Sequence, residues 1–344
     1  MFSKPKISQI LLLSSLMIVF LLGCQSAEVD EALIVKTRNI ENTVTQTPKL
    51  TPRKTEFPTK TLTPISTKKL TATNQPSSIP RATRIPGETQ VSPNDGMVLV
   101  FIPEGTFQMG SRSMDGRADY DEIPQHLVNL DAYWMDQTVV TNAMYVRFLD
   151  EMGNQTEGRT VWLDAGDEDV FIYQLGEEWQ PIQGYEDHPA IEISWYGAQA
   201  YCDWVGRRLP SEAEWEKAAR GSDGRVYPWG DDIDCNKAQY ANCAGGLLTV
   251  DSKPDGASPF GILGLSGNTW EWTSDWYSED YYSSSPLENP KGPDEGETRT
   301  LRGGSWEYDS KHLRAANRRN NGPAVSMHDY GFRCVLDDDV LVEE

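Results

Sequence analysis

The chain after Gly221 has few long apolar periodic stretches, and this feature most constrains what the protein can fold into. It is rich in glycine, asparagine and tryptophan, as in Gly267-Asn268-Thr269-Trp270-Glu271-Trp272. A long helix needs an apolar residue every three or four positions, and a half-buried strand needs sustained alternation. We therefore predict short strands joined by long ordered loops, which disulfides or bound calcium would hold in place.

Strands are expected mainly before this region. Their composition and alternation place them at residues 97–102, 107–109, 126–130 and 133–135, the last two as a pair. Residues 153–188 look like a surface insertion. We expect the insertion to pack against the domain through its aromatic residues, Trp162, Phe171, Tyr173 and Trp179.

Three helices are expected to begin after a capping side chain, at Thr141, Ser194 and Ser211. The third has the strongest signal. Glu214 completes a capping box with Ser211, and Gly221 is a favourable C-terminal stop.

Residues 1–23 resemble the signal peptide of a bacterial lipoprotein. Lys4 and Lys6 precede an apolar run shorter than the about 20 residues that cross a bilayer. Cys24 follows Leu21-Leu22-Gly23, as in a lipobox, so we expect Cys24 to carry the lipid that anchors the chain. The predicted location is the bacterial cell membrane, facing its extracytoplasmic side.

Composition divides the remainder into three parts. Residues 24–94 are rich in Thr, Pro, Ser and Lys and predict a disordered stalk, because they hold too few apolar residues to offset the entropy of ordering. Residues 95–337 are expected to form one domain, and residues 338–344 an acidic tail. Residues 95–344 hold 19 of the 31 basic and 46 of the 52 acidic residues, a formal charge of −27. This charge argues against nucleic acid or anionic lipid headgroups as partners of the domain.

Beyond Cys24 the chain holds four cysteines, Cys202, Cys235, Cys243 and Cys334. In an exported domain they predict two disulfides, and spacing alone permits three pairings.

Four motifs in order resemble the formylglycine-generating enzyme (sulfatase-modifying factor) family: residues 208–216 (RLPSEAEWE), 267–272 (GNTWEW), 302–306 (RGGSW) and 331–334 (GFRC). The resemblance covers residues 96–336. It implies an α+β fold of the C-type lectin type, with short twisted antiparallel strands, a few helices and much irregular loop. It also implies a Cys202–Cys334 disulfide, which leaves Cys235 to pair with Cys243.

The family's chemistry is missing from the expected place. Family enzymes bind copper and oxidise a substrate cysteine with two cysteines that follow the "RGGS" motif. No cysteine lies between Ser305 and Cys334 here. Because a cuprous ion needs soft thiolate ligands, copper is not expected, nor is cysteine-to-formylglycine oxidation. Ser305 matches the family's active-site serine, and we interpret it as turn chemistry.

The resemblance also implies a calcium site. The family's loop supplies two backbone carbonyls and a glutamate, which correspond to Gly267, Thr269 and Glu271, and a second site would map to Asn242. A family side-chain ligand is replaced by Gly264. Hard cations need several oxygen ligands, so this loss would weaken binding.

The block between the last two motifs is rich in long polar and aromatic side chains, a composition typical of adaptable binding surfaces. Its layout resembles the variable region of retroelement-diversified proteins, which have a lectin-like fold and bind ligands. The candidate ligand-binding residues are Trp306, Tyr308, Arg318, Arg319, Asn320, His328 and Tyr330.

The sequence gives little support to two other kinds of site. Some proteins of this fold bind non-haem iron through three histidines, but His126, His188, His312 and His328 are scattered here without helical metal spacing. Ser305, Asp309 and His312 suggest a hydrolase triad by composition, but no nucleophile-elbow pattern surrounds the serine.

Two functional classes follow. The first is a surface lipoprotein that binds a protein, peptide or glycan. The second is an oxidoreductase or protein-modifying enzyme of the family, acting on a sulfur-containing substrate through a different site.

Overall fold

The computed structural model describes residues 84–338, which contain the predicted domain. The signal peptide, Cys24, most of the stalk and the end of the acidic tail lie outside the described residues. In the described part, no helix is long and apolar enough to cross a membrane.

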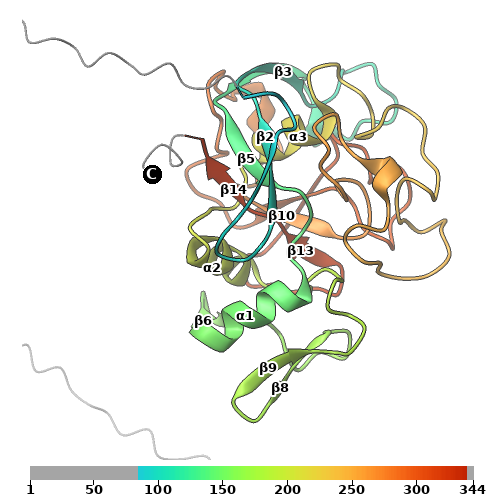
Figure 1. Ribbon diagram of the computed structural model, residues 1–344. Helices are drawn as coiled ribbons and strands as arrows, with labels where there is room; N and C mark the ends of the chain where they lie inside the picture. Colours follow the sequence, from blue (N-terminus) through green and yellow to red (C-terminus); the bar gives the residue numbers. More distant parts are fainter. Residues whose placement is uncertain (1–83, 339–344) are drawn as a thin grey trace, which may run out of the picture. The chain divides into compact units, whose positions relative to one another are not determined.

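Two four-stranded sheets form the centre (Figure 1). The first has the order β1-β2-β5-β14, all antiparallel, and its strands are β1 (Thr89–Val91), β2 (Val98–Ile102), β5 (Tyr133–Asp136) and β14 (Val335–Asp337). The second has the order β12-β11-β10-β13, with β12 (Arg318–Asn321), β11 (Arg299–Arg302), β10 (Trp270–Trp276) and β13 (Tyr330–Phe332). Its β10–β13 pair is parallel.

Three hairpins and three helices surround the sheets. The hairpins are β3 (Gly105–Met109) with β4 (His126–Leu130), β6 (Thr156–Glu157) with β7 (Thr160–Val161), and β8 (Ile172–Leu175) with β9 (Glu178–Pro181). The helices are α1 (Asn142–Met152), α2 (Trp195–Trp204) and α3 (Glu212–Arg220), and the short 3-10 turns are η1 (Tyr120–Glu122), η2 (Pro254–Gly256) and η3 (Tyr281–Ser283). This mixture of few helices and short strands confirms the predicted α+β fold class.

All three helices begin where the sequence predicts. The Thr141, Ser194 and Ser211 side chains each accept a hydrogen bond from a backbone N–H of the first turn. Ser211 and Glu214 form the complete capping box, and α3 ends at Gly221 with φ 62°. Local side-chain chemistry therefore positions α3 at both ends.

Two expectations about strands need correction. Residues 126–130 do not pair with residues 133–135: β4 pairs with β3, and β5 lies between β2 and β14. The folded chain also begins before residue 95, because β1 pairs with β2 and the Arg84 guanidinium lies 5.1 Å from the Trp134 ring centre. The stalk boundary was therefore placed too late.

The insertion packs against the domain, as expected, through part of its aromatic set. Trp162 and Trp179 are each 8% exposed, and the Trp179 backbone N–H donates to Asp150 at the end of α1. The Phe171 ring stacks on Tyr185 at 4.2 Å. Tyr173, by contrast, is 42% exposed on the β8–β9 hairpin.

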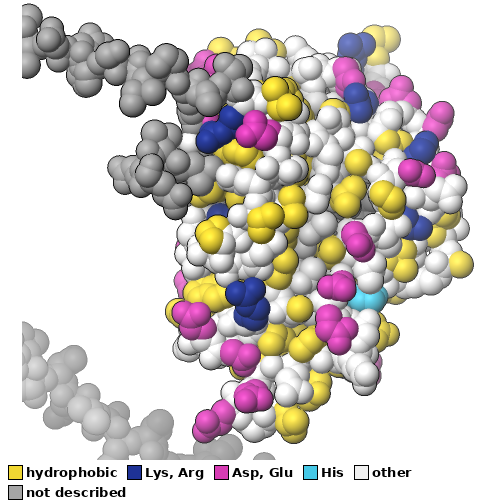
Figure 2. Space-filling view, viewed as in Figure 1, with side chains coloured by type: hydrophobic (Ala, Val, Ile, Leu, Met, Phe, Trp, Pro, Cys, Tyr) yellow, Lys and Arg dark blue, Asp and Glu magenta, His cyan; other side chains and the backbone are white. Residues whose placement is uncertain are grey.

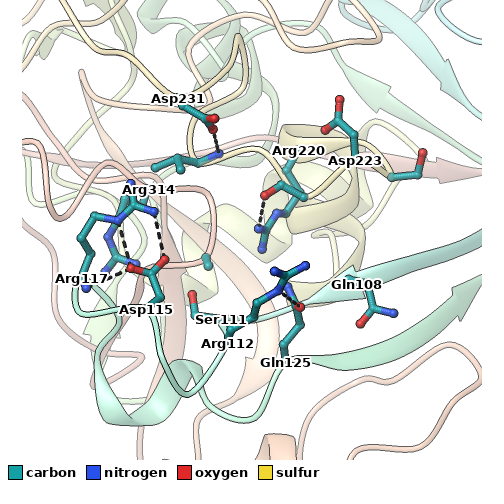
Figure 3. A pocket seen from close by; sticks show the side chains of 14 residues that line it. Gln108, Ser111, Arg112, Asp115, Arg117, Gln125, Arg220, Asp223, Asp231 and Arg314 are labelled. Carbon is teal, nitrogen blue, oxygen red and sulfur yellow. Dashed lines mark hydrogen bonds and ion pairs between the residues drawn. The ribbon is translucent and has the colours of Figure 1, made fainter.

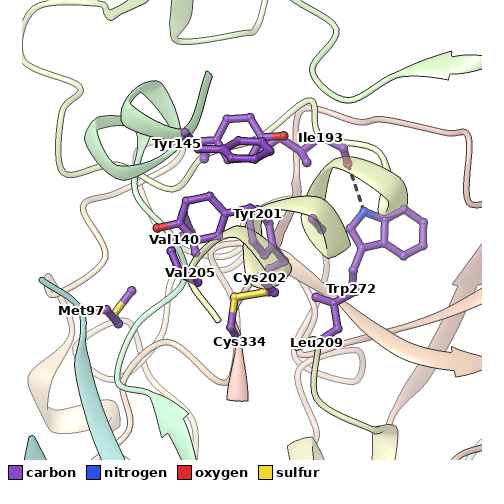
Figure 4. Close-up of a cluster of buried hydrophobic side chains, with 14 of the residues drawn as sticks. Met97, Val140, Tyr145, Ile193, Tyr201, Cys202, Val205, Leu209, Trp272 and Cys334 are labelled. Carbon is purple, nitrogen blue, oxygen red and sulfur yellow. Dashed lines mark hydrogen bonds between the residues drawn. A yellow bond between two sulfur atoms is a disulfide. The ribbon is translucent and has the colours of Figure 1, made fainter. Parts of the chain in front are cut away.

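Both predicted disulfides are present. Cys202 on α2 joins Cys334, between β13 and β14, inside a buried aromatic cluster (Figure 4). Cys235 joins Cys243 within one loop.

Replacing both Cys202 and Cys334 by serine should lower the free energy of unfolding more than replacing Cys235 and Cys243. The chain-entropy estimate is about 5 kcal/mol for the longer loop and about 2.5 kcal/mol for the shorter, since sequence separations are 132 and 8 residues. Guanidinium denaturation of the two double variants measures the order, and the reverse order would contradict this account.

Helix α3 is buried around its whole circumference, including its charged side chains. Glu216, fully buried, pairs with Arg220 at 2.8 Å and with Arg302 at 2.6 Å. The Glu212 carboxylate pairs with Arg302 and Arg318. These ion pairs connect α3 to β11 and β12.

Glu216→Gln should destabilise the protein by about 3–5 kcal/mol, because it leaves two buried guanidinium groups short of a counter-charge. Glu295→Gln is the matched control, since Glu295 is exposed. Urea denaturation at neutral pH compares the two, and equal stabilities would show that the network contributes little.

Candidate functional site

The candidate site is centred on Ser305, which follows β11 through two glycines with positive φ, Gly303 and Gly304. A Cβ at Gly304 would lie 2.8 Å from the His312 carbonyl oxygen, so the close approach requires glycine. The fully buried Ser305 hydroxyl donates to Asp329 at 2.7 Å and accepts from the Glu307 N–H at 3.4 Å. Burial raises the pKa of Asp329, against the lowering effect of the Ser305 hydrogen bond. These bonds fit a turn-stabilising serine.

Half-buried side chains lie beside this pair. The His328 Nε2 atom lies 3.0 Å from a Glu307 carboxylate oxygen, and the Trp306 ring stands edge-on to the His328 ring at 6.1 Å. Burial lowers the pKa of His328, but the Glu307 hydrogen bond and neighbouring acids outweigh it and raise the pKa above its usual value. His328 therefore carries positive charge over a wider pH range than a free histidine.

Arg319 joins this group through aromatic rings. Its guanidinium lies 4.9 Å from the Tyr308 ring centre and 5.4 Å from that of Trp270, and its Nε donates to the Tyr330 hydroxyl at 3.1 Å. Asn320, next on β12, is half-buried, and the alternation of strand side chains directs it to the side opposite Arg319. We name the half-buried group Trp306, Tyr308, Arg319 and His328 the Ser305 face.

Two further predicted ligand-binding residues, Arg318 and Tyr330, also lie away from this face. Arg318 is 6% exposed, pairs with both oxygens of Glu212 at 2.7 and 3.0 Å, and lies over the Tyr282 ring. Tyr330 is fully buried against Trp272. Side chains alternate along β12, so Arg318 is directed to α3 while Arg319 reaches the Ser305 face. Arg318 and Tyr330 support the face but do not form its surface.

A cavity of about 270 Å³ opens beside Trp306 and His328. Its other walls come from the insertion (Asp169, Phe171 and Tyr185), from Ile191 just after the insertion, and from the loop after Cys243 (Gly246 and Leu247). Local sequence patterns do not indicate these residues, because they come from segments far apart in the chain. The aromatic residues of the insertion are the one sequence feature that could have indicated this wall, because Phe171 forms part of it.

Glu192 is a second residue that sequence analysis missed. It is 4% exposed and has φ 56°, a left-handed conformation rare for this residue type. Burial, together with the nearby charge of Asp167, raises its pKa to about 7, while Ser326 and His328 act in the opposite direction. Glu192 follows Ile191, which lines the cavity, and buried carboxyls with a raised pKa and an uncommon backbone conformation are frequent at functional sites.

The carboxylate expected to bind calcium is already occupied by other side chains. The Glu271 carboxylate is fully buried and accepts from Arg333 through both oxygens, at 2.7 and 2.8 Å, and from Trp215 at 2.8 Å. Gly264 offers no side-chain oxygen, and Asn242 is exposed. Among residues 84–338 no cluster of three or more His, Cys, Asp or Glu side chains could hold a metal. The Glu271 carboxylate instead links β10, α3 and Arg333.

The described residues also lack the side-chain arrangements needed for copper binding by thiolates and for a serine hydrolase relay. All four of its cysteines are in disulfides, so it presents no thiolate to copper. Ser305 bonds to Asp329, whereas His312 lies 3.0 Å from Asp309, so these residues do not form a hydrolase relay.

Comparison with known proteins identifies the family to which the chain belongs. Residues 83–338 match the family of sulfatase-modifying factor enzyme 1-like domains. The chain is 36% identical over 301 residues to a formylglycine-generating enzyme of Streptomyces coelicolor, covering 76% of this chain and 96% of that enzyme. It is 40% identical over 245 residues to a protein named serine/threonine-protein kinase Pkn1 of Chlamydia trachomatis, covering 70% of this chain but 38% of that protein.

Solved structures agree on the fold. PvdO from Pseudomonas aeruginosa aligns with a TM-score of 0.61 at 22% identity, over 74% of this chain and all of that one. The variable protein 1 of Treponema denticola aligns with a TM-score of 0.56 at 22% identity, over 73% and 98%. At these identities the likeness concerns the fold alone.

Replacing Glu192 by glutamine should change how stability depends on pH. The folded protein keeps the Glu192 proton up to a pKa of about 7, whereas the unfolded chain loses it near 4.5. Wild-type stability should therefore fall as the pH rises between these values, and the variant should escape this loss, on the order of 1–3 kcal/mol.

Denaturation midpoints from pH 4 to 8 measure the effect, with Glu177→Gln at an exposed position as the control. Parallel pH profiles for the wild type and Glu192→Gln would rule out the raised pKa.

Proposed function

The chain belongs to the family of sulfatase-modifying factor enzyme 1-like domains, and we propose that it uses this fold to bind a ligand rather than to oxidise a cysteine. The ligand is a protein, peptide or glycan, held at the Ser305 face.

The observation that carries the proposal is the state of the cysteines. Cys202, Cys235, Cys243 and Cys334 are all paired, and no other cysteine follows Ser305. Oxidation through a cysteine pair needs thiolates that can bind a soft metal and attack a substrate. The described domain has no free thiolate, whereas the turn at Ser305 is formed and Ser305 is hydrogen-bonded to Asp329.

The Ser305 face has the composition of a recognition surface. Trp306 and Tyr308 are large and partly exposed, and amphipathic aromatic side chains contribute much of the energy in protein and ligand recognition. His328 and Arg319 add donors, and Asp169 adds an acceptor within the adjoining cavity. Acidic side chains spread over the surface drawn in Figure 2 also disfavour nucleic acid and anionic lipid headgroups as partners.

We further propose that the domain acts at a membrane surface. The lipobox-like segment before Cys24 supports a lipid anchor, and the Thr- and Pro-rich segment that follows supports a spacer between membrane and domain. The predicted position is the extracytoplasmic face of a bacterial cell membrane.

An enzymatic role is the second candidate, and the similarity to the Streptomyces coelicolor formylglycine-generating enzyme favours it. The reaction would be an oxygen-dependent oxidation of a sulfur-containing substrate at a site without thiolates. Glu192, His328 and Asp329 would be the groups able to move protons there.

Screening the full chain against a glycan array and a displayed peptide library should yield ligands whose binding depends on the Ser305 face. Trp306→Ala and His328→Ala should each weaken binding of these ligands by about tenfold or more, as expected for central contact residues. Tyr173→Ala is the matched control, because Tyr173 is exposed on a different hairpin.

Oxygen uptake separates the two candidates. The chain mixed with a cysteine-containing peptide, dithiothreitol and copper should consume no more oxygen than the same mixture without it. Metal-dependent uptake above that level would favour the enzyme. Ligands whose binding survives both Ser305-face substitutions would place recognition elsewhere.

A further inference from the structure

A second, larger cavity lies away from the Ser305 face. It has a volume of about 540 Å³ and opens between β3, the loop that follows β3, the end of α3 and the segment around Arg314 (Figure 3). The side chains that line it are nearly all polar, and four of them are arginines: Arg112, Arg117, Arg220 and Arg314. A cluster of four arginines is unexpected in a domain with a formal charge of −27, so the partners of each arginine decide what the cavity can bind.

Buried ion pairs fix the inner wall. Arg314 is 3% exposed and binds the fully buried Glu122 through two hydrogen bonds of 2.7 and 2.6 Å. Arg220 is 5% exposed, donates to Glu216, and uses its other terminal nitrogen for the Gly224 carbonyl. The Arg220 Nε–H has no hydrogen-bond partner within the described residues, but this atom is buried. The Arg220 Nη2 atom makes one hydrogen bond among them, so one of its two N–H groups is available to a ligand in the cavity.

The carboxylates at the rim are mostly neutralised by their own neighbours. Asp115 accepts two hydrogen bonds of 3.0 Å from Arg117. Asp223 is bound in the same way by Arg225, at 2.8 and 2.5 Å. The hydrogen bonds from Arg117 and Arg225 lower the pKa values of the Asp115 and Asp223 carboxyls. They also occupy the oxygens of both carboxylates.

Arg112 is different. Its Nε donates to Gln125 at 3.3 Å, and no ion pair engages its guanidinium among the described residues. Figure 3 shows Arg112 and Arg220 extending toward the same space, with Gln108 and Gln125 beside them. Asp231, the third carboxylate of the cavity, accepts a hydrogen bond from a backbone N–H at 3.2 Å. Four arginines and three aspartates line the cavity, so its formal charge is nearly balanced, and Arg112 is the arginine without an ion pair among the described residues.

We propose that this cavity binds a small oxyanion-bearing molecule, whose carboxylate, phosphate or sulfate group accepts from Arg112 and Arg220. Planar guanidinium groups match such anions in geometry and charge. The volume accommodates a small organic anion, and the polar walls suit its hydroxyl or amide groups. This site is separate from the Ser305 face and does not depend on the function proposed there.

Calorimetric titration of the full chain with inorganic phosphate, sulfate and citrate at constant ionic strength tests the site. We expect saturable binding of at least one anion, and the order among the three identifies the preferred group. Arg112→Gln should weaken that binding by about tenfold or more, because it removes a charged donor. Lys291→Gln is the control, since it removes one exposed positive charge elsewhere.

Arg112 is exposed, so Arg112→Gln should keep the fold, and a wild-type circular dichroism spectrum checks this. Trp306→Ala, at the Ser305 face, should leave anion binding unchanged. Absence of saturable binding for all three anions, or equal binding by wild type and Arg112→Gln, would overturn the proposal.

Discussion

Helix α3 is buried although five of its nine residues are charged, and much of the structure depends on how those charges are compensated. Removing ions from water is costly, so each must find a counter-charge in a fixed position. Glu212 and Glu216 obtain theirs from Arg302 on β11 and Arg318 on β12. Satisfying α3 therefore fixes the two strands that flank the Ser305 turn.

This arrangement explains why neighbouring arginines have opposite roles. Arg318 completes the buried network with Glu212, whereas Arg319 lies one position further and reaches Tyr308 and Tyr330. The pleat of β12 separates them. Glu271 also has a supporting role, because its carboxylate oxygens accept hydrogen bonds from Arg333 and Trp215. Residues that resemble ligand contacts in the sequence thus act as supports in the fold.

This chain keeps the fold of the family without a cysteine pair after the "RGGS" motif. The Cys202–Cys334 bridge holds α2 against the end of the second sheet, and the Ser305 turn keeps its bond to Asp329 without thiols nearby. A scaffold of this kind can carry different sites on its loops. Here the loops form two distinct surfaces: an aromatic face beside Glu192 and His328, and an arginine-lined cavity beside α3.

The sequence by itself determined the local structure and the family. Helix starts at Thr141, Ser194 and Ser211 depend on a side chain and an N–H three residues away, and the four motifs identified the fold and both disulfides. Tertiary structure decided what depends on distant partners. The pairing of β1 and of β5, the burial of Arg318 and Tyr330, the left-handed Glu192 and the insertion's share of the cavity belong to this group. The physical reason is that burial and ion pairing are properties of contacts between segments far apart in the chain, which no local pattern records.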